Sequence, residues 1–271
     1  MHRPHLIASD VDGTLVTPLE RFTDRTRAVL RQVHQDDVPF VLVSGRPPRW
    51  IPPIANPAGI TGYAVCANGA VIYDIAADRV ISTRHLPPVT LRDAAEAIVG
   101  VLPRARFGAE RVGTSATDSS VARIVTESAF HNPWGDDTEC DTGSRADVLG
   151  TAAIKLLVSD ERMASEEMAA AATSVLDGSV AVTYSSNGGL IEISAVSVTK
   201  ATGLAEIVDW FDVDPGNVIA FGDMPNDVAM LGWAGHGVAV ANAHPAVLEV
   251  ADEITGPNTE DGVAQVLERW F

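Results

Sequence analysis

Two carboxylates stand two residues apart near the N-terminus, Asp10 and Asp12, in the segment DVDGT. The apolar run at 6–8 precedes them, which predicts a buried strand that opens into a loop. Gly13 permits a sharp turn there, and Thr14 adds a hydroxyl. Like charges this close raise one another's pKa unless a cation lies between them, and Mg²⁺ accepts oxygen ligands while keeping positions open for a phosphate. Taken alone, the segment is equally consistent with an Asx-type turn.

Polar side chains also follow later apolar runs. Ser44 comes after the run at 38–43, Asn68 after 63–66, and the segment GDMPND at 222–227 after 218–221. Lys200 stands near the start of a predicted helix. A carboxylate nucleophile, a nearby acid or base, oxygen ligands for a metal and donors for phosphate oxygens are the groups that phosphoryl transfer requires.

Each of these residues also has an ordinary structural explanation. Ser44 could cap the helix that follows it, and Lys200 could be a solvated helix residue. Asp223 and Asp227 could be first-turn acids favoured by a helix dipole. Two asparagines at predicted strand ends could be turn residues: Asn68 and Asn242. The order and spacing of the whole set, rather than any single residue, favours catalysis.

The elements that must position these groups alternate between strand-like runs and helical patterns, with helices predicted at 23–35 and 199–211. This alternation predicts a parallel α/β sheet, in which ligands bind beyond the carboxyl ends of the strands. The polar groups stand at those ends. We therefore predict a Rossmann-like core made by residues 1–84 and 187–271.

The middle of the chain, residues 85–186, has strands and helices of its own but no paired carboxylates at strand ends. We predict that it is an inserted α+β domain. It contains an acidic run from Trp134 to Asp141, which we expect to be a solvated loop, with a role in specificity as the alternative.

Composition limits the partners of this 271-residue chain. Asp and Glu number 36 against 19 Lys and Arg, and this acidity disfavours nucleic acid, whose phosphates require a basic surface. Cys66 and Cys140 lie far apart, so neither a zinc site nor a disulfide framework is expected. No run has the length of a membrane span, and residues 1–10 lack the core of a signal peptide. We expect a soluble cytoplasmic protein without a membrane partner, and leave the oligomeric state open.

Four ordered segments of the chain resemble the motifs of the haloacid dehalogenase-like phosphatases: DVDGT at 10–14, Ser44, Lys200 and GDMPND at 222–227. The segments SGR at 44–46, NGA at 68–70 and NTEDGVA at 258–264 resemble the Cof-type branch of that superfamily. This branch carries a C2-type (IIB) α+β cap between its second and third motifs, where we predict the insertion, so the resemblance implies that residues 85–186 are a cap domain that determines substrate specificity. Ala201 stands where Gly is frequent in the family, a departure expected to affect packing more than chemistry.

The resemblance implies a role for each matched residue. Asp10 would attack phosphorus and form an aspartyl-phosphate, and Asp12 would protonate the leaving alcohol and then accept a proton from water. Mg²⁺ would be held by Asp10, the backbone carbonyl of Asp12, and Asp223. The remaining assignments are phosphate binding by Ser44, Gly45, Lys200 and Asn226, support by Thr14 and Asp227, and candidate substrate contacts at Arg46 and Asn68.

We therefore expect a Mg²⁺-dependent phosphatase of small phosphorylated metabolites, with sugar phosphates as the favoured class. One alternative is a phosphomutase or phosphotransferase, in which another hydroxyl replaces water at the aspartyl-phosphate. Another is a non-catalytic metabolite-binding protein on the same scaffold. The presence of both Asp10 and Asp12 argues against this last alternative, because a binding protein does not need a nucleophile beside an acid.

Overall fold

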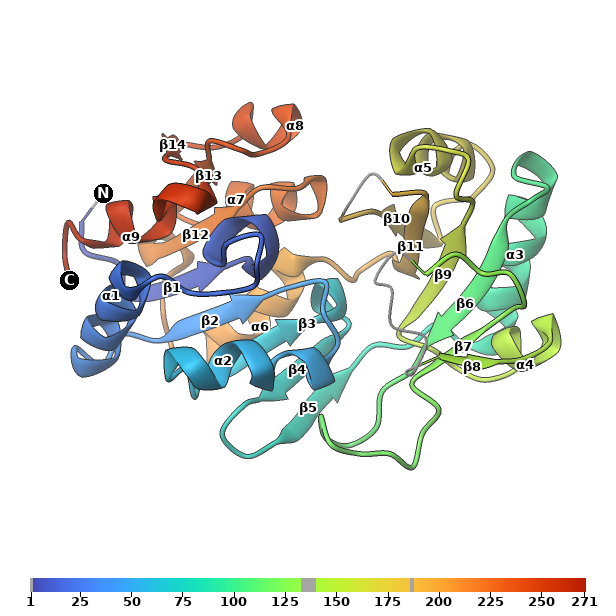
Figure 1. Ribbon diagram of the computed structural model, residues 1–271, viewed down its shortest axis with the longest axis horizontal. Helices are drawn as coiled ribbons and strands as arrows, with labels where there is room; N and C mark the ends of the chain where they lie inside the picture. Colours follow the sequence, from blue (N-terminus) through green and yellow to red (C-terminus); the bar gives the residue numbers. More distant parts are fainter. Residues whose placement is uncertain (1, 133–139, 186–187) are drawn as a thin grey trace. The chain divides into compact units, whose positions relative to one another are not determined.

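The structure is a computed structural model that describes residues 2–132, 140–185 and 188–271. The chain forms two compact units, one from Met1–Ser82 with Thr199–Phe271, the other from Thr83–Val198. In Figure 1 the blue N-terminal and red C-terminal parts of the chain both belong to the first unit.

The sheet of the first unit has the strand order β14-β13-β12-β1-β2-β3-β4-β5. β1 (Leu6–Ser9) pairs in parallel with both β2 (Phe40–Val43) and β12 (Val218–Gly222). The pairing remains parallel outward to β14 and to β3, and β3 and β4 are antiparallel. These observations confirm the predicted parallel core. The remaining strands are β3 (Tyr63–Cys66), β4 (Val71–Asp74), β5 (Arg79–Thr83), β13 (His236–Val240) and β14 (Glu253–Thr255).

Helices cover this sheet on both faces, since neighbouring strand residues that point in opposite directions, such as Ile7 and Ala8, are equally buried. α1 (Asp24–Gln35) and α6 (Lys200–Trp210) begin where predicted, because Thr23 and Thr199 each accept a hydrogen bond from the backbone N–H three residues later. The other helices of this unit are α2 (Pro52–Ala58), α7 (Val228–Trp233), α8 (Pro245–Leu248) and α9 (Gly262–Leu267).

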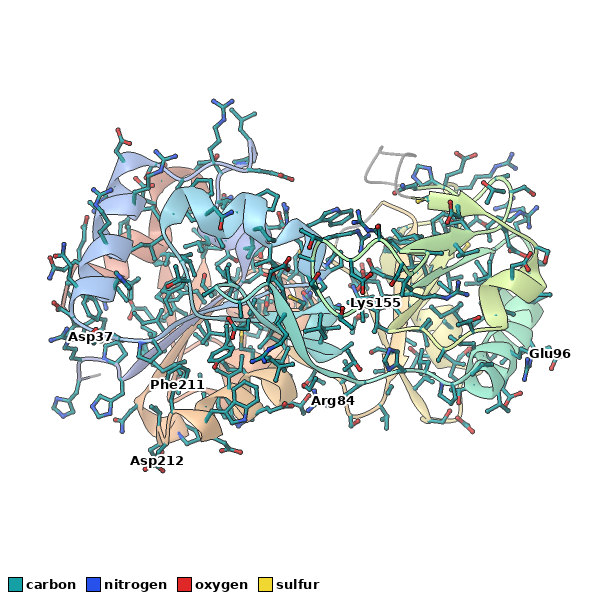
Figure 2. The ribbon with its side chains drawn as sticks, turned by 90° about the horizontal axis from the view of Figure 1, so that it is seen from below. Asp37, Arg84, Glu96, Lys155, Phe211 and Asp212 are labelled. Atoms are coloured by element: carbon teal, nitrogen blue, oxygen red, sulfur yellow. The ribbon has the colours of Figure 1, made fainter. Side chains whose placement is uncertain are left out.

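The sheet of the second unit has the order β10-β11-β9-β6-β7-β8 and is antiparallel except between β7 and β8. Its apolar core joins α3 and α5 to one face of the sheet. Lys155, on β9, is buried and donates to Glu192 on β11 at 2.9 Å (Figure 2). The elements are β6 (Arg106–Glu110), β7 (Ile124–Thr126), β8 (Cys140–Thr142), β9 (Lys155–Ser159), β10 (Val180–Thr183), β11 (Leu190–Ala195), α3 (Pro88–Val101), α4 (Arg145–Leu149) and α5 (Ser165–Thr173).

The second unit ends later than the predicted boundary between 186 and 187. The physical reason is β11, which pairs with β9 and β10 and therefore belongs to this sheet rather than to the parallel one. Residues 133–139, most of the acidic run, lie outside the described residues. Among the described helices, none has the length and apolar character needed to cross a membrane.

Candidate active site

The predicted catalytic residues lie at one edge of the first unit's sheet. Asp10 and Asp12 follow β1, Ser44 follows β2, and Asp223 follows β12. These three strands are adjacent and parallel, so their carboxyl ends meet at the same edge. Lys200 reaches the same place from the first turn of α6, where it is buried beside Asp10.

Lys200 is held by two carboxylates. Its Nζ donates to Oδ1 of Asp10 at 2.5 Å and to Oδ1 of Asp227 at 2.6 Å. The other oxygen of Asp227 accepts the backbone N–H groups of Asp223 and Met224, each at 3.0 Å. Because Asp227 accepts hydrogen bonds at both of its oxygens, it holds the Lys200 ammonium in place.

Three buried carboxylates face this single ammonium. Asp10, Asp223 and Asp227 each place one oxygen within 4.8 Å of the others. Burial raises the pKa of Asp10 well above its ordinary value, against the lowering effect of Lys200 and with further raising by Asp227, Asp223 and Asp12. Burial, followed by the charge of Asp227, raises the pKa of Asp223 to about 6, although the Thr14 hydroxyl opposes this. Burial lowers the pKa of Lys200, but Asp10 and Asp227 outweigh it and leave that pKa raised.

The residues present fit a divalent cation. Three carboxylates and one ammonium leave two negative charges unmatched, and a hard cation with oxygen ligands would remove that imbalance. Asp10 and Asp223 are the side chains best suited to bind it, because the oxygens of Asp227 already accept hydrogen bonds from Lys200 and two backbone N–H groups.

Gly13 shapes the loop after β1, and residues from other parts of the unit hydrogen-bond to this loop. Gly13 has φ +77°, and a Cβ there would lie 2.3 Å from Oδ2 of Asp223. Thr14 donates to the other oxygen of Asp223 at 2.8 Å and so holds that carboxylate against the loop. Asn242 donates to the Gly13 carbonyl at 2.8 Å, so it is more than a turn residue. Asn258 donates a hydrogen bond to the Val16 carbonyl and so holds the next part of the loop.

The contact between Gly13 and Asp223 gives a testable prediction. Gly13→Ala should lower the free energy of unfolding by about 1–2 kcal/mol for the left-handed backbone alone, and it should also displace the Asp223 carboxylate and so weaken metal binding. Gly59→Ala is the matched control, because Gly59 has φ +70° but open space around its Cβ position. Thermal unfolding with and without Mg²⁺ compares the two variants. Equal responses to Mg²⁺ would contradict a role for this contact in the metal site.

Arg46 contacts Asp12. Its Nε donates to Oδ2 of Asp12 at 2.8 Å and its Nη2 to Oδ1 at 2.6 Å, while Nη2 also lies 2.9 Å from Oε1 of Glu20. Burial lowers the pKa of the guanidinium, but Asp12 and then Glu20 outweigh it and leave the pKa raised. The Asp12 carboxylate therefore points to Arg46 and is not one of the three carboxylates of the buried cluster.

Two of the predicted phosphate-binding residues, Gly45 and Asn226, lie beside Asn68. Asn226 donates from Nδ2 to Oδ1 of Asn68 at 3.0 Å, and a Cβ on Gly45 would lie 3.3 Å from that same oxygen. Ser44 is buried, and its hydroxyl accepts the backbone N–H of Arg46 at 3.1 Å within the loop. It does not cap the helix that follows, because the short helix Pro48–Trp50 has Pro47 at its N-cap position. Oδ1 of Asn226 is buried without a hydrogen-bond partner among the described residues, an acceptor that a water molecule would satisfy.

Sequence reasoning missed two residues of this region, Glu20 and Asn242. Asn242 was weighed only as a turn residue, although it follows a strand on the same edge of the sheet as Asp10. Glu20 offered no sequence signal, since nothing in the local pattern places a Glu beside the segment SGR.

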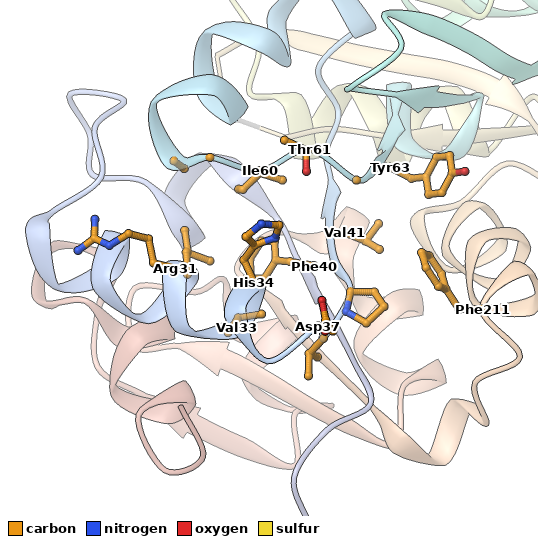
Figure 3. Close-up of a pocket in the computed structure, with 16 residues that line it drawn as sticks. Arg31, Val33, His34, Asp37, Phe40, Val41, Ile60, Thr61, Tyr63 and Phe211 are labelled. Atoms are coloured by element: carbon orange, nitrogen blue, oxygen red, sulfur yellow. The ribbon is translucent and has the colours of Figure 1, made fainter.

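A groove of about 490 Å³ lies elsewhere on this unit (Figure 3). The residues that line it include Phe40 and Val41 from the beginning of β2, Tyr63 from the beginning of β3, Thr61 just before that strand, and Phe211. The groove is thus at the amino ends of the strands, whereas the catalytic candidates follow the carboxyl ends. It is separate from the candidate active site.

Comparisons with known proteins identify the family of this chain. Residues 7–267 match the model of a family described as haloacid dehalogenase-like hydrolase. A relative from Bacillus subtilis, named 5-amino-6-(5-phospho-D-ribitylamino)uracil phosphatase YcsE, is 28% identical, and the alignment covers 98% of this chain and 95% of the relative.

Two solved structures share the fold. A haloacid dehalogenase-like hydrolase from Bacteroides thetaiotaomicron has a TM-score of 0.77 at 26% identity, with 99% of this chain and 100% of that chain covered. The subclass IIB sugar phosphatase BT4131 has a TM-score of 0.78 at 20% identity, with 98% of each chain covered. The predicted fold class and family are both confirmed. The chain belongs to the haloacid dehalogenase-like hydrolases and is an enzyme of their phosphatase type.

Proposed function

We propose that this enzyme is a Mg²⁺-dependent phosphatase that hydrolyses small phosphorylated metabolites, with phosphates of sugars and sugar alcohols as the expected class. The observation that carries the proposal is the buried cluster in which Lys200 binds both Asp10 and Asp227, with Asp223 adjoining and Asp12 two residues from Asp10. The substrate class is supported by the names of the B. subtilis relative and of the sugar phosphatase BT4131.

The proposed reaction consists of two successive displacements at phosphorus. In the first, a carboxylate oxygen of Asp10 attacks phosphorus as the bond from phosphorus to the alcohol oxygen breaks, and Asp12 gives that oxygen a proton. In the second, Asp12 takes a proton from water, the water oxygen attacks phosphorus, and the bond to Asp10 breaks to release phosphate.

Charge compensation is the main requirement of the first step, because a carboxylate must approach a phosphate dianion. Lys200 supplies one positive charge at hydrogen-bond distance from the nucleophile. Mg²⁺, held by Asp10, Asp223 and the Asp12 carbonyl, would supply the remaining charge to the nucleophile and the phosphate oxygens. In this proposal Ser44, Gly45 and Asn226 bind the other phosphate oxygens.

Release of inorganic phosphate from a panel of phosphorylated metabolites tests the function. Activity should require Mg²⁺, disappear with a chelator and return when Mg²⁺ is restored. Asp223→Asn should abolish both the activity and the stabilisation that Mg²⁺ gives in thermal unfolding. Phosphate release at the full rate in metal-free buffer would rule out the metal site, and transfer of the phosphoryl group to an added alcohol would favour the phosphotransferase alternative.

The stabilisation by Mg²⁺ should also depend on pH. The carboxyl group of Asp223, with its pKa raised to about 6, stabilises the metal-free fold below the ordinary pKa of an aspartate, and this contribution is lost as the pH rises through 6. Protons and Mg²⁺ compete for the same oxygens, so the increase in melting temperature on adding Mg²⁺ should be larger at pH 8 than at pH 5.

We also propose that the second unit selects the substrate. The residues assigned to the phosphate and metal are all in the first unit, and they do not distinguish one phosphate ester from another. Exchanging residues 83–198 for the corresponding unit of a relative with a different preference should transfer that relative's ranking of kcat/KM values. A folded chimera that retains this enzyme's own ranking would place specificity in the first unit.

A further inference from the structure

Arg46, in the loop after β2, lies between two carboxylates of the segment that connects β1 to α1, those of Asp12 and Glu20. Its guanidinium contacts both oxygens of Asp12 through two nitrogens, and Nη2 also contacts Glu20. The Arg46 side chain is 12% exposed, whereas the side chains of Asp12 and Glu20 are 52% and 62% exposed. A nearly buried guanidinium thus holds two carboxylates that have most of their surface in solvent.

The backbone at Glu20 is unusual for a residue with a long side chain. Glu20 has φ +55°, and the other described non-glycine residues with positive φ are all Asp, Asn or Ala. The turn is closed by hydrogen bonds from Thr17 N–H to the Arg21 carbonyl and from Glu20 N–H to the Thr17 carbonyl. Glycine adopts this conformation without strain, so a glutamate there is disfavoured unless its side chain has a use. Burial does not supply one, since this side chain is mostly exposed.

We propose that Arg46 and Glu20 are positioning residues for Asp12, the proton donor of the reaction. Arg46 fixes the plane of the Asp12 carboxylate through two parallel hydrogen bonds, and Glu20 fixes the guanidinium through Nη2, a nitrogen that also donates to Asp12. The inference rests on the proposed function, in which Asp12 must deliver a proton to the leaving oxygen.

The geometry explains why these residue types are needed. A paired fork of two N–H groups removes the rotation of a carboxylate about its Cβ–Cγ bond, whereas the ammonium of a lysine acts as a point charge and permits that rotation. Half of Asp12 is exposed, so packing alone does not hold it. The ion pair with Glu20 supplies a second anchor for Arg46 that leaves the Asp12 oxygens in place.

The test compares Arg46→Lys, Glu20→Gly and a matched control, Asp212→Gly, on alkyl and aryl phosphates. Asp212 is exposed (Figure 2) and has φ +51°. It follows α6 rather than β1, so its replacement by glycine relieves the same kind of backbone strain in another part of the unit. Arg46→Lys should lower kcat for alkyl phosphates by up to about 10²-fold, the loss that misplacement of a reacting group produces. Glu20→Gly should lower it less. The phenol oxygen of an aryl phosphate leaves with little protonation, so kcat for aryl phosphates should change less in both variants. KM should be retained.

Melting temperatures distinguish a positioning role of Glu20 from a purely structural role. Glu20→Gly and Asp212→Gly should shift the melting temperature alike, because an exposed ion pair adds little to stability, yet only Glu20→Gly should slow alkyl phosphate turnover. Equal losses of kcat on alkyl and aryl substrates, unchanged kinetics, or faster turnover would each overturn the proposal.

A measurement that does not depend on turnover tests this inference separately from the proposed function. Exchange of the Arg46 Nε–H with water, followed by NMR, should be faster in Glu20→Gly than in the wild type and unchanged in Asp212→Gly. Unchanged exchange in Glu20→Gly would overturn the role of Glu20 even in an enzyme that releases phosphate. Absence of phosphate release by the wild type from every substrate would instead overturn the proposed function, and with it the role of Asp12 that the inference requires.

Discussion

Asp10→Asn should reduce turnover of every phosphorylated substrate to the background rate, a loss of about 10⁴-fold or more. The amide has nearly the same shape as the carboxylate but does not attack phosphorus, so no bond from residue 10 to phosphorus forms. The structure gives this change a specific meaning, because Asp10 is the carboxylate that Lys200 binds at the carboxyl end of the central strand β1. Steady-state phosphate release measures the loss.

The covalent intermediate provides the second measurement for this variant. Acid quenching of the wild type during the first turnover with ³²P-labelled substrate should leave label on the protein, and Asp10→Asn should carry none. Asp209→Asn is the matched control, since Asp209 is an exposed aspartate near the end of α6 in the same unit. Labelled protein in the Asp10→Asn sample would mean that another residue is the nucleophile.

Much of the core fold was predictable from local patterns. The helices at 23–35 and 199–211 and the strands at the apolar runs 6–8, 38–43 and 218–221 were predictable, because amphipathic and apolar patterns depend on neighbouring residues alone. The sheet to which a strand belongs is a different question. β11 has the apolar sequence of a core strand, and only its pairing with β9 and β10 assigns it to the second unit.

The site shows the same division between local and distant causes. The convergence of Asp10, Asp223 and Lys200 follows from topology, since carboxyl ends of adjacent parallel strands share one edge. The contacts of Arg46 with Asp12 and Glu20 do not follow from it. They depend on the conformations of two loops, one of which places Glu20 at a φ that its sequence does not indicate.

Lys200→Met should be the most destabilising single change in the site. Lys200 is 1% exposed and is the ammonium shared by Asp10 and Asp227, so a methionine of similar length would leave two buried carboxylates without their partner. Removing one member of a buried ion pair lowers the free energy of unfolding by about 3–5 kcal/mol. Turnover should fall as well, because the approach of Asp10 to the phosphate loses a positive charge. Denaturant unfolding and phosphate release measure the two effects.

The dependence on pH and Mg²⁺ identifies the cause of that loss. Lys200 lowers the pKa of Asp10, which burial has already raised, so the variant should raise it further. A carboxyl group with a raised pKa stabilises the fold at acidic pH, and that stabilisation is lost as the pH rises through the folded-state value. The difference in stability from the wild type should therefore widen between pH 5 and pH 8 and narrow when Mg²⁺ is added.

Lys155→Met is the control for this effect. It removes a buried lysine paired with Glu192 and should lose stability without any recovery in Mg²⁺. If Mg²⁺ restored both variants equally, or neither, the stability of Lys200→Met would be independent of the metal site, and the carboxylates around Lys200 would be a structural ion network.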